Sequence, residues 1–123
     1  MMTGVVNAKL EATLTVRVIG PGGQFQEVPT VIDTGYNGFI TLPISITTAL
    51  SLVKSAAREV TLGDASRKVF EYYTAQVIWE GQPHKVRVLN IEGDPLIGTA
   101  LLAGYKLEAD FVVGGTVVLQ PVP

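Results

Sequence analysis

Alternation of apolar and polar residues dominates the N-terminal part of the chain. Every second residue from Leu10 to Val18 is apolar, and the residues between them are Glu, Thr or Arg. A period of two places one set of side chains on one face, so a half-buried strand is predicted here. Gly20-Pro21-Gly22-Gly23 then reverses the chain, and a return strand through Phe25 and Val28 follows.

Short strands separated by turns continue along the rest of the chain. Pro29 leads into a buried apolar pair, Val31-Ile32. The later predicted strands cover residues 39–42, 60–62 (ending at Leu62), 69–73, 75–79 and 85–90, and a final pair turns at Gly114-Gly115. Two short helices are predicted, at residues 44–53 and at residues 99–103, where Gly104 is the C-cap. The pattern indicates an all-β domain with little helix.

Two hairpins and an internal similarity organise the second half. The polar tip Gly63-Asp64-Ala65-Ser66 predicts a projecting hairpin, and Glu80-Gly81-Gln82-Pro83 predicts another. The hairpin that turns at Glu80–Pro83 is similar to the hairpin that turns at Gly20–Gly23. The segment Leu96-Ile97-Gly98 follows the former as Val31–Gly35 follows the latter. We interpret this as a duplicated strand–turn–strand unit. A small chain of hairpins can also show such similarity without duplication.

Composition narrows the classes of protein. The chain has 123 residues, 47% apolar and 16% charged, so we expect one globular domain over residues 1–123. The absence of cysteine excludes a cysteine nucleophile and a disulfide framework, and the single histidine, His84, excludes a multi-histidine metal site. Nine basic residues stand against 11 acidic ones and are scattered along the sequence, so no nucleic-acid partner is expected.

The same features bear on location and cofactors. The apolar stretches are too short to span a bilayer, and no basic region followed by an apolar run opens the chain. We therefore expect a soluble, cytoplasmic protein that does not contact a membrane. No carboxylate spacing suggests a calcium loop or a metal cluster, and no cofactor is expected. A Ser-His-Asp triad with His84 is possible in principle, but chemistry, if there is any, falls mostly to the four aspartates and seven glutamates.

One motif combines a carboxylate with a fixed direction. Asp33 directly follows the apolar pair and precedes Thr34-Gly35. The backbone N–H of Gly35 can approach the carboxylate because no Cβ intervenes, and the Thr34 hydroxyl can anchor the turn. Asp-Thr-Gly is also a good turn sequence, so the tripeptide alone is weak evidence for catalysis.

In its context the motif resembles the active site of aspartic peptidases, specifically the small single-lobe retropepsin-like families. Three features carry the resemblance: Val31–Gly35 with the strand that follows, a hairpin at residues 61–73 in the position of a flap, and Leu96-Ile97-Gly98 before a short helix. It extends from about residue 4 to residue 119. It is particularly close to a prokaryotic group in which an aromatic residue follows Asp-Thr-Gly and Thr-Leu-Pro ends the next strand. It implies an acid-protease fold: an all-β, retropepsin-like closed barrel with one short C-terminal helix.

The resemblance also implies an activity. The family needs two aspartates, but the position that matches Asp33 in the second half is Gly98. A homodimeric aspartic endopeptidase is implied, in which two Asp33 carboxylates meet across a two-fold axis and share one proton. The ionised one takes a proton from water, and the protonated one donates to the carbonyl oxygen of a peptide bond. Thr34 would hold the two motif loops together. The flap tip would cover the peptide or protein substrate, and it consists of Gly63, Asp64, Ala65 and Ser66.

Two departures from the family pattern leave a second function open, a non-catalytic peptide-binding or assembly module that keeps this fold. The flap tip is polar, without the apolar, Gly-rich tip of the viral members. The C-terminal tail carries Pro121 and Pro123, which cannot donate to a sheet between subunits.

Other candidate residues receive simpler interpretations. Asp94 is interpreted as a turn residue rather than as an intrachain partner of Asp33. His84 is expected to be a solvated residue at the end of a hairpin. Arg67-Lys68 are expected to solvate the hairpin, although they could also bind an acidic substrate. Tyr72 is expected to pack on its strand or to line a cleft.

Overall fold

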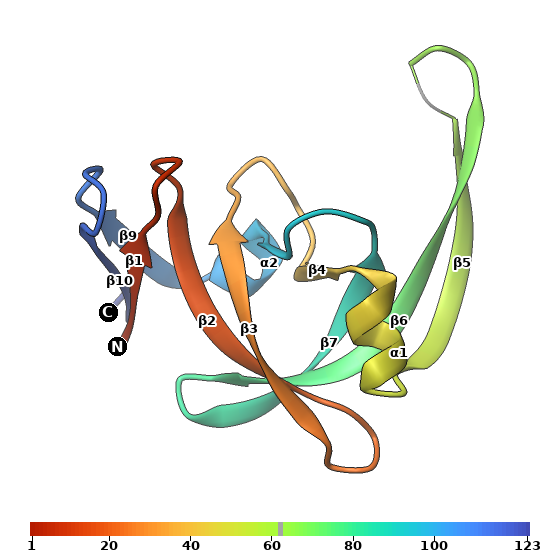
Figure 1. The fold of residues 1–123 in the computed structure, drawn as a ribbon, viewed down its shortest axis with the longest axis horizontal. Coiled ribbons are helices and arrows are strands. Elements are labelled where there is room, and N and C mark those ends of the chain that lie inside the picture. Colours follow the sequence, from red (N-terminus) through yellow and green to blue (C-terminus); the bar gives the residue numbers. More distant parts are fainter. Residues whose placement is uncertain (62) are drawn as a thin grey trace.

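Strands account for most of the computed structural model, which describes residues 1–61 and 63–123 (Figure 1). Leu62, the last residue of one predicted strand, lies outside the described residues. In chain order the elements are β1 (Met2–Val6), β2 (Ala12–Ile19), β3 (Phe25–Ile32), β4 (Ile40–Leu42), α1 (Ile44–Ala49), β5 (Val53–Thr61), β6 (Arg67–Trp79), β7 (Gln82–Asn90), β8 (Leu96–Ile97), α2 (Thr99–Leu102), β9 (Tyr105–Ala109) and β10 (Thr116–Pro121). The predicted all-β class is confirmed.

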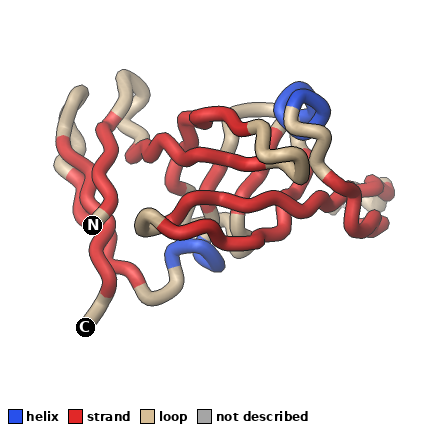
Figure 2. Tube along the Cα trace, turned by 90° about the horizontal axis from the view of Figure 1, so that it is seen from below, coloured by secondary structure: helices blue, strands red, loops and turns tan. Residues whose placement is uncertain are grey.

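Six strands close into a hydrogen-bonded ring in the order β6-β7-β4-β8-β3-β2, and β2 pairs back onto β6. The sheet extends beyond the ring at both ends. β1, β10 and β9 follow β2 on one side, whereas β5 continues from β6 on the other. Figures 1 and 2 show these two extensions at opposite ends of the molecule. The chain termini lie in the first extension, and the long β5–β6 hairpin forms the second.

Alternate residues of the ring strands fill its interior. Leu14, Val16 and Val18 of β2 are buried, as the alternation predicts, because the intervening threonine and arginine side chains face outwards. Trp79 of β6 closes one side of this core and packs edge-on against Tyr105, with ring centroids 5.7 Å apart. The prediction was wrong at Leu10, which is 51% exposed. It lies in the β1–β2 turn with a φ of 60°, and this positive φ takes it out of the strand.

Three element boundaries also differ from the prediction. α1 ends at Ala49 rather than at residue 53, because Ser51 takes a φ of 52° and β5 begins at Val53. Both predicted helices are present in the described residues, as α1 and α2. β6 is a single strand where two were predicted, and β1 was not predicted, because its five residues carry no clear alternation.

Strand pairing agrees with a duplicated unit. Val18 lies opposite Val77 in the β2–β6 pair, and Ile32 lies opposite Ile97 in the parallel β3–β8 pair. These are the residues that the two sequence repeats make equivalent. Each repeat therefore pairs with the other at corresponding positions, and β8 is inserted between β3 and β4.

Candidate active site

Asp33 stands at the end of β3, where two long-range contacts fix its direction. Ile32 pairs with Ile97 of β8, and the Asp33 backbone N–H donates to the Ile97 carbonyl at 2.9 Å. The backbone is therefore hydrogen-bonded to β8 as far as Asp33, the residue that carries the carboxylate. The Asp33 side chain is half-buried at this strand end.

The turn after Asp33 orients its carboxylate. The Gly35 N–H donates to Asp33 Oδ1 at 2.9 Å, and the Tyr36 N–H donates to the Asp33 carbonyl at 3.2 Å. A Cβ on Gly35 would lie only 3.2 Å from Oδ1, so glycine permits this close approach. The contact predicted between the Gly35 N–H and the carboxylate is therefore present. The second oxygen, Oδ2, accepts no hydrogen bond from the described residues.

Thr34 occupies the exposed position of this turn. Its side chain makes no hydrogen bond to the part of the chain that the structure describes. The turn is held by the backbone groups of its neighbours instead. The Thr34 hydroxyl therefore remains available for a group from outside the chain.

The loop that follows rests on the N-terminal end of α2. The Thr99 N–H donates to the Tyr36 carbonyl at 2.8 Å, and the Ala100 N–H donates to the Gly38 carbonyl at 3.1 Å. In the other direction, the Gly98 N–H donates to the Phe39 carbonyl at 3.0 Å. The segment Leu96-Ile97-Gly98, singled out in the sequence, thus supports the Asp33 loop from below.

Gly98 is required here for space, and this gives a testable prediction. A Cβ at this position would lie 2.7 Å from the Tyr36 carbonyl oxygen and would collide with the Gly38 carbonyl oxygen. We expect Gly98→Ala to lower the free energy of unfolding by about 2–3 kcal/mol, because backbone rather than a flexible side chain must move. Gly63→Ala, where a Cβ meets nothing within 4 Å, is the matched control. Thermal or urea unfolding measures both, and equal stability of the two variants would contradict this packing.

A cavity of about 430 Å³ adjoins the carboxylate. Asp33 and Thr34 line it together with Leu96, Glu11 and Phe111. The sequence interpretation missed Glu11 and Phe111, because the β1–β2 and β9–β10 turns reach this place only through long-range pairing. Asp94 is exposed and does not line this cavity, in keeping with a turn residue.

An apolar tip stands beside this cavity. Phe111, Val112 and Val113, in the β9–β10 turn, are 59%, 63% and 67% exposed. Leu10, in the β1–β2 turn, lines the same cavity as Phe111. Three consecutive apolar residues before Gly114-Gly115 are unusual in a turn, and this pattern is the sequence signal that marks the tip.

Tyr36 is a further residue of the site. Its half-buried ring packs over Gly38 and Gly98. Burial raises the pKa of the Tyr36 phenol, and the neighbouring Tyr72 phenol raises it further. Tyr36 therefore keeps its proton and remains a hydrogen-bond donor next to Asp-Thr-Gly.

The β5–β6 hairpin projects from the ring, as the polar tip predicted (Figure 1). At the tip, the Ser66 N–H donates to Asp64 Oδ1 at 3.0 Å, and Ala65 takes a φ of 68°. Hydrogen bonds from the Ser66 hydroxyl and backbone N–H lower the pKa of the Asp64 carboxyl. The tip Gly63–Ser66 is exposed throughout.

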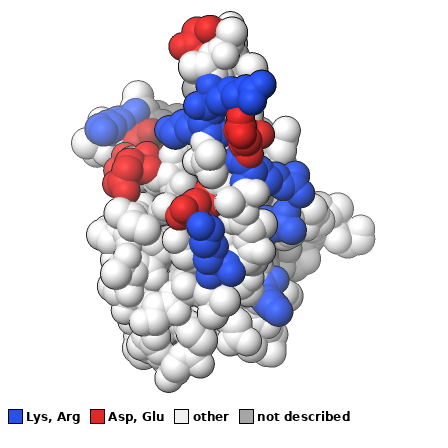
Figure 3. Space-filling model, turned by 90° about the vertical axis from the view of Figure 1, so that its right-hand side faces the viewer, with Lys and Arg blue, Asp and Glu red and all other residues white. Residues whose placement is uncertain are grey.

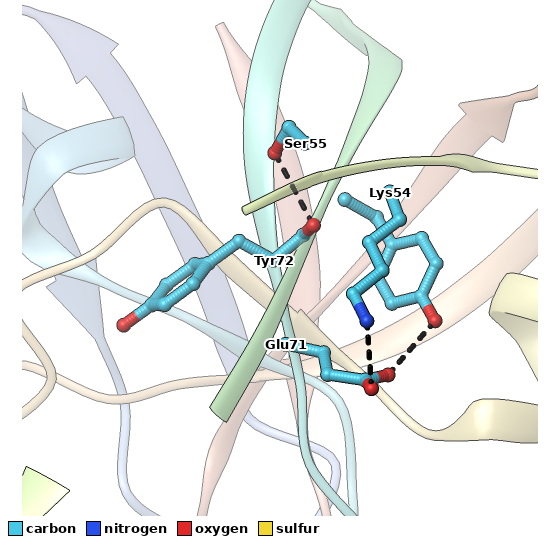
Figure 4. A network of polar contacts seen from close by, with 5 residues as sticks. Lys54, Ser55, Glu71 and Tyr72 are labelled. Atoms are coloured by element: carbon cyan, nitrogen blue, oxygen red, sulfur yellow. Dashed lines mark hydrogen bonds and ion pairs between the residues drawn. The ribbon is translucent and has the colours of Figure 1, made fainter. Parts of the chain in front are cut away.

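Polar contacts fasten the base of this hairpin (Figure 4). Lys54 Nζ lies 3.0 Å from Glu71 Oε1, and the Tyr73 hydroxyl donates to Glu71 Oε2 at 3.1 Å. These two contacts lower the pKa of the Glu71 carboxyl. The Ser55 hydroxyl donates to the Tyr72 carbonyl at 3.2 Å, where the β5 register shifts between Lys54 and residue 56.

Among residues 1–61 and 63–123, no group of three His, Asp or Glu side chains is placed to hold a metal ion. Over the same residues, no helix is long and apolar enough to cross a membrane.

Comparison with known proteins identifies the fold. No family model matches the chain, and no curated protein sequence matches it. Two solved structures are similar. A retropepsin-like aspartic protease from Rickettsia conorii aligns with 99% of this chain and 92% of its own, at 13% identity and a TM-score of 0.54. The EIAV protease complexed with the inhibitor HBY-793 aligns with 78% of this chain and 88% of its own, at 17% identity and a TM-score of 0.53. The chain has the retropepsin-like fold that the sequence predicted.

Proposed function

We propose that this protein is an aspartic endopeptidase that hydrolyses peptide bonds with a water activated by two Asp33 carboxylates, one from each protomer of a homodimer. One observation carries the proposal. Asp33 stands at the end of a buried strand, oriented by the Gly35 N–H, in a chain that has the fold of retropepsin-like aspartic proteases.

A second protomer is needed because the chain has the motif once. The internal repeat places Gly98, which is buried, where a second aspartate would stand. A two-fold axis beside Asp33 brings two identical carboxylates together, and a C2 dimer is the commonest way to form one. Carboxylates about 3 Å apart share one proton, so the pair titrates as a unit.

The shared proton gives each carboxylate a role. The ionised Asp33 accepts a proton from the attacking water, while its protonated counterpart donates to the carbonyl oxygen of the scissile bond. Oδ1 is held by Gly35, so the orientation of each carboxylate is fixed before substrate binds. Thr34 offers its exposed hydroxyl to the other protomer's loop, and Leu96-Ile97-Gly98 holds the loop from below. The tip Gly63–Ser66 covers the bound substrate and excludes water.

The apolar tip beside Asp33 supplies the contacts between protomers. β10 already lies between β1 and β9, and the Val122 N–H donates to the Gly104 carbonyl at 2.8 Å. The C-terminal strand is thus paired on both sides within its own chain. The exposed side chains of Leu10, Phe111 and Val112 stand next to the cavity of Asp33 and become buried when two such faces meet.

The direct test is hydrolysis by the purified protein. Unfolded protein and peptide libraries are incubated with it from acid to neutral pH, and the products are identified by mass spectrometry. We expect cleavage with a bell-shaped dependence of kcat/KM on pH, because one carboxylate must be ionised and the other protonated. Intact substrates at every pH, in a preparation shown to be dimeric, would contradict the proposal.

The polar hairpin tip favours a second function, a peptide-binding or assembly module without catalysis. At this exposed tip the Ser66 hydroxyl donates a hydrogen bond to the Asp64 carboxylate. The tip therefore offers no apolar surface to cover a substrate. Under this alternative the libraries are bound but not cleaved, and Asp33→Asn binds them as the native protein does.

A further inference from the structure

Strand register sorts the charges of the β5–β6–β7 sheet onto two faces. Residues directly opposite each other in an antiparallel pair point to the same side. Arg58 is opposite Phe70, Arg87 is opposite Thr74, and Lys85 is opposite Gln76. These residues and Lys68 all share the face of the even-numbered residues of β6. Val77 and Trp79, which alternate with them, are buried in the core, so this face points outwards.

The outward face carries four cations and no carboxylate in the described strands. Both carboxylates of β5–β7, Glu59 and Glu71, occupy the opposite face. There they form ion pairs with Arg67 at 3.1 Å and with Lys54 at 3.0 Å. Figure 4 shows the Tyr72 side chain pointing away from the Lys54–Glu71 pair, as the two faces require. The positive charge of the outward face is therefore not neutralised by the strands that carry it.

Two aromatic rings lie among these cations. Lys68 Nζ is 5.4 Å from the centre of the Phe70 ring, and the Arg87 guanidinium is 5.6 Å from that of Tyr72. Both rings are half-buried, so they give the flexible cations a fixed support. We name this surface the outer strip, and it consists of Arg58, Lys68, Phe70, Tyr72, Lys85 and Arg87.

Concave surface is available at both ends of the outer strip. At one end, a cavity of about 450 Å³ is lined by Lys85, Gln76 and Pro21 of the β2–β3 turn. At the other end, Lys68 and Phe70 line a cavity together with two carboxylates, those of Glu71 and Glu92. The Glu92 carboxylate accepts a hydrogen bond from the Ile44 N–H at 3.2 Å. The recess that fits an acidic ligand is therefore the one beside Lys85, which no carboxylate of the described residues lines.

Charge over the whole chain identifies the kind of ligand. Six of the nine basic residues lie on β5–β7. Figure 3 shows lysine and arginine side chains over the end of the molecule that carries the hairpin, with several acidic side chains between them. The remaining segments carry three basic residues, which are Lys9, Arg17 and Lys106, against most of the 11 acidic ones. A long polyanion such as nucleic acid or an anionic membrane would meet those acidic segments. A short acidic peptide would meet only the strip.

We propose that the outer strip binds an extended, acidic segment of the protein substrate, separate from the segment that contains the bond that is cut. This rests on the proposed peptidase function. From Lys68 to Gln76 the strip is about 26 Å long, at about 3.3 Å per residue, which corresponds to about eight residues of extended peptide. Tyr72 lies in the middle of the strip, and its phenol is close enough to the Tyr36 phenol of the Asp33 loop to raise the pKa of that group.

Binding without cleavage tests the proposal independently of catalysis. The probe is a fluorescein-labelled ten-residue peptide of alternating Glu and Ser, with a Gln-Ser peptide as its neutral counterpart. Fluorescence anisotropy at low salt is measured for Asp33→Asn protein and for the same protein with Lys68→Ala and Arg87→Ala. We expect the acidic peptide to bind, and the strip variant to raise its Kd about fivefold or more. The matched control is Lys9→Ala with Lys106→Ala, which removes the same charge elsewhere.

Three outcomes would overturn the proposal. Equal weakening in the strip and control variants would overturn the proposal in favour of net charge alone, and so would equal binding of the neutral peptide. Binding of oligo-deoxythymidine or phosphatidylserine vesicles, but not of the acidic peptide, would overturn it in favour of another partner.

A catalytic readout separates this proposal from the proposed function. In active protein, the strip variant should raise KM for a substrate with an acidic extension, while kcat, and the KM of the unextended substrate, stay unchanged. Binding without any cleavage would retain the outer strip and reject the peptidase. Cleavage with the same KM for both substrates in the strip variant and the native protein would retain the peptidase and reject the outer strip as a binding site.

Discussion

Asp33→Asn is expected to abolish peptide hydrolysis, with kcat/KM reduced at least about 10³-fold. The amide of asparagine can neither accept a proton from water nor deliver one to the carbonyl oxygen. Its Oδ1 can still accept the hydrogen bond that the Gly35 N–H donates at 2.9 Å, so the turn and the fold are retained. Activity on a fluorogenic peptide and thermal unfolding are measured together, so that loss of chemistry is separated from loss of structure.

Two other carboxylates provide controls for this experiment. Asp94→Asn changes an exposed turn residue outside the cavity, and activity should be unaffected. Glu11→Gln changes a carboxylate that lines the same cavity as Asp33, and activity should fall no more than a few-fold. An inactive Glu11→Gln with a native fold would show that the second carboxylate comes from the same chain. That result would contradict a site shared between protomers.

Phe111→Asp is expected to separate the protomers and to remove activity with them. The ring is 59% exposed in the single chain, so its replacement leaves the protomer fold intact. In the proposed dimer a carboxylate at this position would be buried without a partner in both copies. We therefore expect the dimer Kd to rise at least about 100-fold.

Sedimentation velocity and the concentration dependence of activity measure this effect. Phe25→Asp is the matched control, because Phe25 is 52% exposed and lies at the far end of β3, in the β2–β3 hairpin. The control should remain dimeric and active. A Phe111→Asp protein that sediments and cleaves like the native one would show that protomers meet elsewhere.

The elements around Asp33 could be predicted from the sequence because each depends on residues that are close together along the chain. Alternation in β2 gave the buried face of Leu14, Val16 and Val18, and Asp-Thr-Gly after an apolar pair gave the oriented carboxylate. The polar tip of the β5–β6 hairpin was predicted for the same reason, since turn residues act on their immediate neighbours.

Long-range pairing produced the rest of the site, and no local pattern encodes it. The insertion of β8 between β3 and β4 brings Ile97 opposite both Ile32 and Ile40. The β1–β2 and β9–β10 turns reach Asp33 only because β1 pairs with both β2 and β10. Glu11 and Phe111 were missed for that reason. The two faces of the outer strip likewise follow from the β5–β6 register, which includes a shift after Lys54.

Mixing native and inactive chains tests most directly whether the active site belongs to two protomers. Native protein is equilibrated with a ninefold excess of Asp33→Asn protein, whose ability to dimerise is first verified by sedimentation. If one site needs Asp33 from both protomers, activity per native chain falls to about one tenth, since most native chains then pair with an inactive one. Unchanged activity per native chain would mean that each chain holds a complete site, and would contradict the account.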